Sequence, residues 1–399
     1  MPDRLAILTS HPIQYYAPLF REIARRIDVK VFFAHAATAK QQGEAGFGVA
    51  FDWDLDLLDG YPYEFLRNVA SDPSAQHFFG CDTPEIGEKI AAGRFTALLV
   101  TGWHLKSYWQ GIRGAKRYDI PVMVRGDSHL GNSTDPGKRL VKGAAYPFLL
   151  RLFDAALYVG QRNRAYYERY RYPEERLFHS PHCVDTARFS GGAGPESRAA
   201  LRARLGIGAN VKCVLFAGKL IDFKRPLDVI EAAALVRAKR HHLVHVTFAG
   251  SGPLEAEARA RAEALHVPLY VLGFQNQTQM PAAYAAADVL VLPSTRETWG
   301  LVCNEALACG TPIIVSDAVG CAPDLAADGS VGRMFPVANV AALAEAITAT
   351  LCAPPSAEAI RRISGRHGLP AAVAGISAAL QALPNRRMPC NKNVPVSLT

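Results

Sequence analysis

The sequence has no run of about 20 uninterrupted apolar residues, the length that a membrane-spanning helix requires. The nearest candidate, residues 144–160, is broken by Arg151 and Asp154. The first ten residues indicate a short strand rather than a secretory signal peptide. We therefore expect the protein to lie in the cytoplasm.

The sequence also lacks paired cysteines. Its eight cysteines are scattered without a C-x-x-C motif, and several lie in apolar segments. This spacing predicts free thiols in a reducing compartment and gives no structural zinc site.

Length and composition predict two folded domains. A chain of 399 residues exceeds what one ordinary hydrophobic core accommodates. Hydrophobic residues make up 49% of the chain and charged residues 20%, which is typical of a globular rather than a disordered protein. The formal net charge of +8 suits an anionic membrane, a nucleic acid or a negatively charged nucleotide sugar, and composition alone does not choose among these partners.

Short apolar runs alternate with helical patterns along the chain. In the first half, strands are predicted at 5–9, 29–34, 97–101, 120–124 and 155–159, and helices at 15–26, 85–92 and 105–118. The alternation restarts near Val211, with strands at 213–217, 244–249, 269–272, 289–292 and 313–316, and with helices that begin at Pro226, Pro253, Met280 and Leu301. This order predicts an α/β protein with two doubly wound, mostly parallel sheets, which bind ligands at the carboxyl ends of their strands.

Two glutamates, Glu297 and Glu305, are separated by seven residues around a predicted helix start. Residues 288–293 predict a buried strand, and residues 301–308 predict a helix. Glu297 then lies in the loop after the strand, and Glu305 lies about one turn inside the helix. The amides of residues 300–302 lack intrahelical partners and favour a bound anion. This arrangement suits a ligand with a central diphosphate and a hydroxylated ring at each end, which describes a nucleotide sugar.

The segment from Ser294 to Pro312 resembles the signature of the retaining, GT-B-fold glycosyltransferases of family 4, also called group 1. In that family the first glutamate contacts the donor sugar, the helix amides hold the distal phosphate, and the second glutamate binds the ribose hydroxyls. The resemblance assigns these roles to Glu297, to Gly300 and Leu301, and to Glu305.

The resemblance also implies a domain organisation. We expect two Rossmann-like domains that face each other across a cleft, with residues 1–184 binding the acceptor and residues 185–369 binding the donor. A helix at 370–384 is expected to cross back to the first domain, and residues 385–399 are expected to form a loose tail. Between the domains, residues 179–189 resemble the interdomain linker of the family, and the glycine-rich segment 190–195 predicts a flexible loop.

A second motif, residues 216–226, puts two cations beside a predicted helix start. Gly218 allows a close turn at the end of a strand, and Lys219 and Lys224 supply positive charge for a diphosphate, while Pro226 begins the helix. The family more often has arginine at the first of these positions. Lys219 therefore keeps the charge but loses bidentate geometry.

Two further segments are expected near the donor. Residues 249–254 lack the third glycine of a dinucleotide fingerprint and predict a structural turn near the phosphates. The resemblance implies that residues 272–276 contact the nucleobase mainly through the backbone around Phe274. Because backbone contacts do not depend on the side chains, the sequence does not identify the base.

The acceptor side is expected in the first domain. The segment His11–Phe20 is rich in rings where many family members have a glycine-rich loop, and we expect His11, Gln14, Tyr15 and Tyr16 to bind a sugar acceptor. An equally good reading makes Tyr15 part of the core stripe of a helix. A second polar loop follows the strand at 120–124, and the resemblance makes Asp127 and His129 candidates for contact with the transferred sugar; either residue also suits a helix cap.

We expect neither a metal nor another cofactor besides the donor substrate, a UDP-, GDP- or dTDP-sugar. Asp52, Asp54 and Asp56 have D-x-D spacing, which binds a metal in the other main glycosyltransferase fold, but they alternate with apolar residues as in a half-buried strand. The resemblance implies a metal-independent enzyme.

Basic and aromatic residues between Lys138 and Arg176 suit either peripheral contact with an anionic inner membrane or a solvated face. This set includes Lys142, Arg151, Arg162, Arg164, Tyr166, Tyr167, Arg169 and Tyr170. Nucleic acid is not expected as a partner, because no nucleic-acid-binding motif accompanies the positive charge.

These features and the resemblance predict a bacterial, retaining glycosyltransferase that transfers a hexosyl unit from a nucleotide diphosphate sugar to a glycan, a lipid-linked glycan or a small acceptor. Its expected role is the synthesis of cell-surface polysaccharides or glycoconjugates. Two alternatives stay open, a nucleotide-sugar 2-epimerase-like enzyme of the same fold and a non-catalytic sugar-nucleotide-binding protein.

Overall fold

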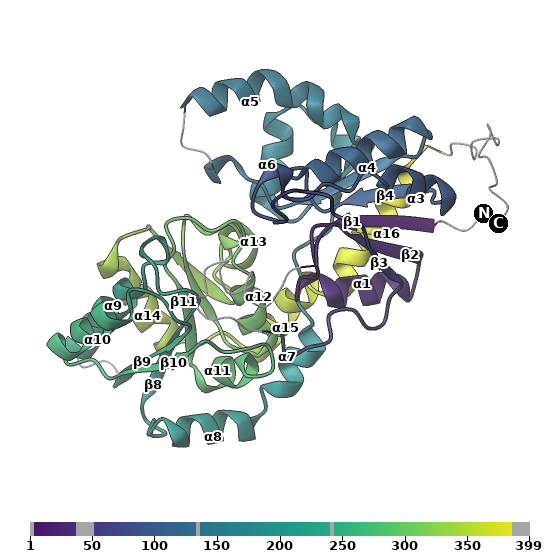
Figure 1. Ribbon diagram of the computed structural model, residues 1–399. Coiled ribbons are helices and arrows are strands. Elements are labelled where there is room, and N and C mark those ends of the chain that lie inside the picture. The colour runs from purple at the N-terminus through teal and green to yellow at the C-terminus, as the bar shows by residue number, and fades with distance from the viewer. Residues whose placement is uncertain (1–3, 37–51, 133–135, 240–242, 385–399) are drawn as a thin grey trace.

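The computed structural model describes residues 4–36, 52–132, 136–239 and 243–384 of the chain. These residues form two lobes, each built around its own sheet (Figure 1). All pairings within both sheets are parallel. The prediction of two doubly wound α/β units is therefore confirmed.

The first sheet has seven strands among the described residues. In spatial order they are β3 (Tyr63–Phe65), β2 (Asp28–Phe33), β1 (Arg4–Thr9), β4 (Ala97–Val100), β5 (Val122–Gly126), β6 (Ala155–Tyr158) and β7 (Leu177–His179). The central strands β1, β4 and β5 are buried except at Arg4 and Gly126, as the continuous apolar runs in the sequence predict for a sheet covered on both faces.

Successive residues of β1 point into two different cores. Leu5 and Ile7 pack with α1 (Tyr16–Ala24) and α16 (Leu369–Ala382), whereas Ala6 and Leu8 pack with α3 (Ile86–Ala92) and α4 (Lys106–Arg117). The other helical segments of this lobe are α5 (Pro136–Leu149), α6 (Gln161–Arg169), η1 (Phe78–Gly80), η2 (Leu130–Asn132), η3 (Leu150–Leu152) and η4 (Glu174–Arg176).

The second sheet has six strands among the described residues. In spatial order they are β10 (Leu269–Gly273), β9 (Val244–Ala249), β8 (Lys212–Ala217), β11 (Val289–Leu292), β12 (Ile313–Ser316) and β13 (Gly332–Phe335).

Helices cover both faces of this sheet as well. One core contains residues from α7 (Thr186–Gly192), α8 (Pro195–Arg204), α11 (Met280–Ala286), α12 (Leu301–Ala308), α13 (Ala322–Leu325) and α15 (Ala357–Arg366). The opposite core contains residues from α9 (Pro226–Ala238), α10 (Glu255–Ala264) and α14 (Val340–Cys352). A single turn, η5 (Asp222–Lys224), precedes α9.

The last described helix, α16, lies in the first lobe although it follows the second lobe in sequence (Figure 1). Its residues Ala372, Val373 and Ile376 are fully buried in the core beside α1. At Gly375 the backbone of β7 comes so close that an added Cβ would lie 1.9 Å from the carbonyl oxygen of His179. The expected tail at 385–399 lies outside the described residues.

Three local predictions are wrong. The segment 190–195 is not a flexible loop, because α7 continues to Gly192 and α8 begins at Pro195. Helix α7 forms there because the side chain of Asp185 accepts a hydrogen bond from the amide of Arg188, at 3.0 Å, and caps its first turn.

The second wrong prediction is the strand around Asp52, Asp54 and Asp56. This segment is a loop held against the second lobe, since Asn276 donates a hydrogen bond of 2.8 Å to the carbonyl of Asp52 and the amide of Thr278 donates one of 3.0 Å to the carboxylate of Asp54.

The third concerns three tyrosines of the expected surface at 138–176. Tyr166, Tyr167 and Tyr170 belong to the core of the first lobe rather than to its surface. Arg162 donates hydrogen bonds to backbone carbonyls of the second lobe, including that of Ala318 at 3.2 Å.

The seven cysteines within the described residues are free thiols, and Cys390 lies outside them. In the same part of the chain, no single helix is long and apolar enough to cross a membrane; the segments Val340–Cys352 and Ala357–Ala382, bent by 117°, reach that length and composition only as a pair.

Candidate active site

One cavity of about 220 Å³ lies at the carboxyl ends of β8 and β9 and beside the start of α12. This is the edge at which open parallel sheets bind their ligands. The cavity brings together every residue that the sequence assigns to the donor: Gly218, Lys219, Lys224, Phe274, Glu297, Gly300, Leu301 and Glu305. We call it the second-domain cavity.

The loop between β11 and α12 presents backbone amides to this cavity. Gly300 caps the helix in the left-handed region, with φ at 100°, and an added Cβ would lie 2.9 Å from the side chain of Leu292. Glycine is therefore required for the close turn that starts α12. The first-turn amides of Leu301 and Val302 border the cavity, where they favour negative charge.

The two lysines reach the cavity from the segment after β8. Lys224 forms an ion pair with Glu297, and both side chains are largely buried. The two loops are tied together because the amide of Thr295 donates a hydrogen bond of 2.8 Å to the carbonyl of Phe223. Lys219 and Lys224 lie close together at the cavity wall. Burial and the charge of Lys224 therefore lower the pKa of Lys219.

Glycine also shapes the floor of the cavity. At Gly250, with φ at 153°, an added Cβ would lie 1.9 Å from the carbonyl oxygen of Gly218. Gly250 and Ser251 line the cavity. The turn after β9 therefore lies beside the two lysines, as the sequence predicts, and only a residue without a side chain fits there.

Glu305 is partly buried and lines the cavity. The hydroxyl of Tyr284 donates a hydrogen bond of 2.6 Å to its Oε2 atom. Burial raises the pKa of Glu305 to about 7, although Tyr284, Arg188 and Gln277 act in the opposite direction. At neutral pH this carboxyl group is partly protonated, and hydrogen bonds from ligand hydroxyls would favour its charged form.

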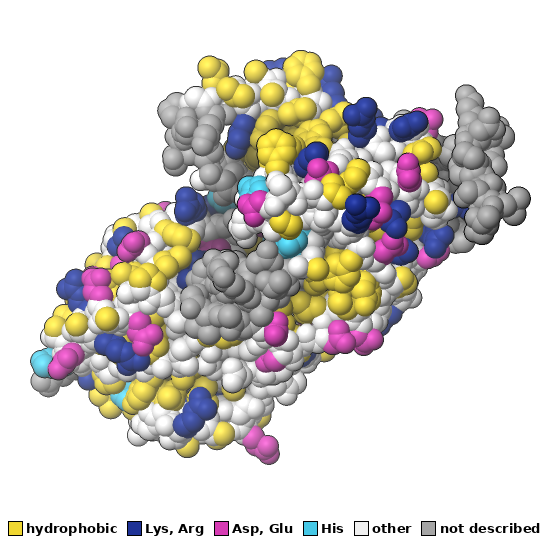
Figure 2. Space-filling view, viewed as in Figure 1, with side chains coloured by type: hydrophobic (Ala, Val, Ile, Leu, Met, Phe, Trp, Pro, Cys, Tyr) yellow, Lys and Arg dark blue, Asp and Glu magenta, His cyan; other side chains and the backbone are white. Residues whose placement is uncertain are grey.

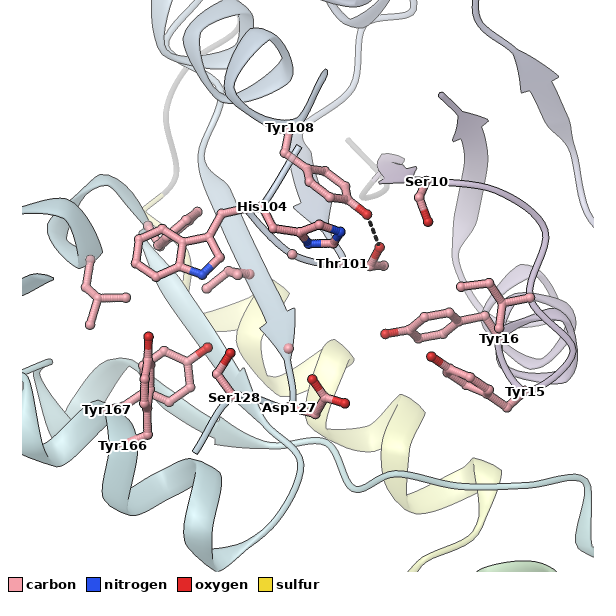
Figure 3. Close-up of a pocket in the computed structure, with 17 residues that line it drawn as sticks. Ser10, Tyr15, Tyr16, Thr101, His104, Tyr108, Asp127, Ser128, Tyr166 and Tyr167 are labelled. Carbon is pink, nitrogen blue, oxygen red and sulfur yellow. Dashed lines mark hydrogen bonds between the residues drawn. The ribbon is translucent and has the colours of Figure 1, made fainter. Parts of the chain in front are cut away.

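A second cavity, of about 240 Å³, lies in the first lobe, and we call it the first-domain cavity (Figure 3). Tyr15 and Tyr16 enter it from the start of α1, and Asp127 enters it from the end of β5. Tyr15 also lines the second-domain cavity, as does Gln14. The two cavities therefore share a wall at Tyr15.

His11 and His129 line neither cavity. His11 hydrogen-bonds to the hydroxyl of Ser10 at 3.0 Å, and burial lowers its pKa to about 4. His129 is buried and accepts a hydrogen bond of 3.1 Å from the amide of Gly131 at Nδ1, which is the capping role that the sequence left open. It still lies near the backbone of Glu297.

No sequence pattern assigns a role to His182, which lies at the junction of the two lobes. Its Nε2 atom lies 3.6 Å from the Oδ2 atom of Asp127, and its ring packs between Tyr15 and Trp299. The carbonyl of His182 accepts a hydrogen bond of 3.2 Å from Asn304 of α12. Burial alone would raise the pKa of Asp127, but His182 and Arg125 hold it below its usual value.

Trp53 and Gln277 also line the second-domain cavity without any local signal in the sequence. No cluster of three or more potential metal ligands occurs among the residues that the structure describes.

The comparisons with known proteins agree with this geometry. Residues 197–365 match the family described as "Glycosyl transferases group 1". The D-inositol 3-phosphate glycosyltransferase of Mycobacterium bovis (strain BCG / Pasteur 1173P2) is 35% identical over 178 residues, which are 43% of this chain and 37% of the relative. The chain thus matches little more than a third of the length of that curated relative.

Solved structures match over nearly the whole chain. Alr3699/HepE of Anabaena, in complex with UDP, is 17% identical, with a TM-score of 0.73 over 95% of this chain and 100% of that one. A glycosyltransferase of Rickettsia africae ESF-5 is 12% identical, with a TM-score of 0.71 over 96% of this chain and 100% of that one. The chain therefore has the GT-B fold, and residues 197–365, which lie in its second lobe, match the group 1 glycosyltransferases.

Proposed function

We propose that the protein is a retaining glycosyltransferase that transfers a hexosyl unit from a nucleotide diphosphate sugar to a glycan, a lipid-linked glycan or a small acceptor. The observation that carries the proposal is the composition of the second-domain cavity. Two glutamates, two lysines and the start of a helix line one space of about 220 Å³. Cations and free amides suit a diphosphate, and carboxylates suit hydroxyl groups.

The arrangement of these groups suggests how a donor lies. The diphosphate binds Lys219, Lys224 and the amides of α12, and the transferred sugar contacts Glu297. The ribose binds Glu305, and the base packs near Phe274.

Transfer then breaks the bond between the anomeric carbon and the diphosphate oxygen. A new bond to the acceptor oxygen forms on the same face of the sugar, and the acceptor proton passes to an oxygen of the leaving phosphate. Negative charge on the diphosphate grows as the bond breaks. Lys224 and the amides of α12 stabilise that charge. In this mechanism the protein's own groups stabilise the leaving diphosphate, and no metal is required.

Two alternatives use the same cavity. A 2-epimerase-like enzyme would consume the donor without an acceptor, and a non-catalytic binder would not consume it at all. A thermal-shift panel of UDP, GDP, dTDP and their sugars identifies the donor, because a ligand that binds the native state raises the melting temperature. UDP-glucose is the first donor to try, since Alr3699/HepE was also solved in complex with UDP-glucose.

Release of the nucleoside diphosphate is then measured with and without acceptor glycosides. We expect release to require the acceptor. Acceptor-independent conversion of the sugar would favour the epimerase, and binding without any release would favour the non-catalytic protein. A protein that no nucleotide sugar stabilises would contradict all three.

We also propose that the protein works in the cytoplasm and contacts an anionic membrane surface through α5, in the synthesis of cell-surface polysaccharides or glycoconjugates. Leu140, Val141 and Phe148 are 78%, 67% and 71% exposed. Figure 2 shows hydrophobic side chains at the top of the first lobe, where Figure 1 places α5. The exposed cations Arg139 and Arg151 flank them, and such a helix face suits the headgroup region of an anionic leaflet.

Vesicle sedimentation tests this contact. We expect binding to vesicles that contain phosphatidylglycerol, and loss of binding in Leu140→Glu and Phe148→Glu. Equal binding to purely zwitterionic vesicles, or unchanged binding of both variants, would contradict the proposed contact.

A further inference from the structure

The first-domain cavity is rich in aromatic rings and hydroxyl groups. Tyrosines reach it from three elements, namely α1, α4 and α6, and Figure 3 shows the hydroxyls of Tyr15, Tyr16 and Tyr108 directed toward its interior. Ser10, Thr101 and Ser128 add further hydroxyl groups. Aromatic faces pack against the C–H face of a sugar ring, and hydroxyls exchange hydrogen bonds with its O–H groups.

Its charge differs from that of the second-domain cavity. Asp127 is the one carboxylate among the described residues that line it, and no lysine or arginine belongs to that set. The lining includes one histidine, His104, and burial lowers its pKa, so the ring is neutral at pH 7.

The nearest buried cation is already engaged. Arg125, which is 1% exposed, donates hydrogen bonds to the hydroxyl of Ser180, to the carbonyl of Ser180 and to the carbonyl of Pro181, at 3.1, 3.2 and 2.8 Å. Its guanidinium lies over the ring of Tyr16, outside the set of lining residues. A phosphate in the cavity would therefore face Asp127, and none of the described residues that line the cavity is a lysine or arginine that could bind it.

The first-domain cavity and the second-domain cavity share Tyr15 as a lining residue. A ring bound in the first-domain cavity would therefore lie beside the donor.

We propose that the first-domain cavity binds a neutral, polyhydroxylated ring of the acceptor, an unphosphorylated sugar or cyclitol, and rejects rings that carry a phosphate or a carboxylate. This inference rests on the proposed transferase function. The charge of the two cavities differs. The second-domain cavity, where we place the diphosphate, has two lysines and a helix start. In the first-domain cavity Asp127 repels an anionic ring, and no lysine or arginine among the described lining residues offsets that repulsion. The cavity therefore selects neutral rings by an unfavourable contact with anionic ones.

The experiment compares acceptors in matched pairs, with the donor found by the thermal-shift panel. The pairs are myo-inositol with inositol 3-phosphate, glucose with glucose 6-phosphate, and glucose with glucuronic acid. Formation of glycosylated product is measured for each. We expect kcat/KM for at least one neutral ring to exceed that for its anionic partner by about tenfold or more.

Two variants test whether the cavity is responsible. Ser128→Lys adds a cation beside Asp127 and is expected to reduce the neutral-to-phosphorylated ratio by about threefold or more. The matched control, Ser190→Lys, adds the same charge at an exposed position of α7 and is expected to leave the ratio unchanged. A ratio is used because it is insensitive to a general loss of active protein.

The outcomes separate the two proposals. If donor binds and phosphorylated rings are glycosylated as fast as neutral ones, or if no neutral ring is glycosylated, this inference is wrong while the donor assignment stands. If Ser128→Lys and Ser190→Lys behave alike, the cavity does not select the acceptor. If no nucleotide sugar binds, the proposed function itself fails.

Discussion

The ammonium group of Lys224 donates a hydrogen bond to the carboxylate of Glu297, although the two residues are 73 positions apart in sequence. Both belong to the second-domain cavity, and both side chains are less than one fifth exposed. A diphosphate that binds Lys224 competes with Glu297 for the ammonium. We therefore expect donor binding to free the Glu297 carboxylate for the hydroxyls of the transferred sugar.

Lys224→Ala should lower turnover more than donor affinity, because the charge on the diphosphate grows in the transition state. The expected loss in kcat is roughly 10² to 10³, the scale for one preorganised electrostatic group. Steady-state kinetics check this, with Lys239→Ala, an exposed lysine at the end of α9, as the control. A variant that raises KM alone would limit Lys224 to ground-state binding.

Glu305→Ala should weaken binding of the nucleotide sugar by about 1.5 to 3 kcal/mol, the cost of losing hydrogen bonds to a charged group. Calorimetry measures the affinity directly. Glu257→Ala removes an exposed carboxylate from the first turn of α10 and serves as the control. Equal affinities in the wild type and in Glu305→Ala would remove the ribose assignment.

Binding of the donor should release a proton near neutral pH. The pKa of Glu305 is about 7, and ribose hydroxyls that donate to its carboxylate favour the charged form and lower that pKa. Affinity for UDP-glucose should therefore rise as the pH increases toward 7 and level off above it. Calorimetry in buffers of different ionisation enthalpy detects the proton, and Glu305→Gln should abolish its release. Proton uptake by the wild type would contradict the assigned role.

Asp127→Ala should leave nucleoside diphosphate affinity within about twofold, because Asp127 lies outside the second-domain cavity. Transfer should fall at least about tenfold, or about 1.4 kcal/mol of barrier. His129→Ala should have a smaller effect, since His129 lines neither cavity and acts through the loop that carries Asp127. Wild-type transfer by both variants would move the acceptor site toward Gln14 and Tyr15.

Turnover should survive chelation by EDTA. Asp54, the central residue of the D-x-D motif, accepts hydrogen bonds from the backbone and the hydroxyl of Thr278, so its carboxylate is held between the lobes. Lys219 and Lys224 supply the positive charge that a metal would bring to the diphosphate. Activity that EDTA abolishes and Mg²⁺ or Mn²⁺ restores would overturn this prediction.

The donor side could be predicted because its chemistry is local in sequence. Glu297, Gly300 and Glu305 belong to one loop and one helix, so their spacing fixes their relative positions. The same holds for Gly218 and Lys224, which follow one strand. Alternating apolar runs likewise predicted the order of strands and helices, because parallel strands buried on both faces leave continuous apolar segments.

The remainder depends on contacts between distant segments. His182 reaches Asp127 and Trp299 only because the two lobes meet there, and Trp53 reaches the second-domain cavity through a loop held by Asn276. No local pattern reports such contacts. The tyrosines of α6 were placed on the surface because their neighbours are basic, but the fold turns Tyr166 and Tyr167 into the core.

The central claim is that the second-domain cavity delivers a sugar from a nucleotide diphosphate donor with its anomeric configuration kept. Proton NMR of the transfer reaction tests it most directly, because the anomeric coupling of the first product reports the configuration before any equilibration. With an α-linked donor such as UDP-glucose, we predict an α-linked product that forms only in the presence of acceptor and is greatly reduced in Lys224→Ala. A β-linked product, or no transfer from any nucleotide sugar that stabilises the protein, would contradict the account.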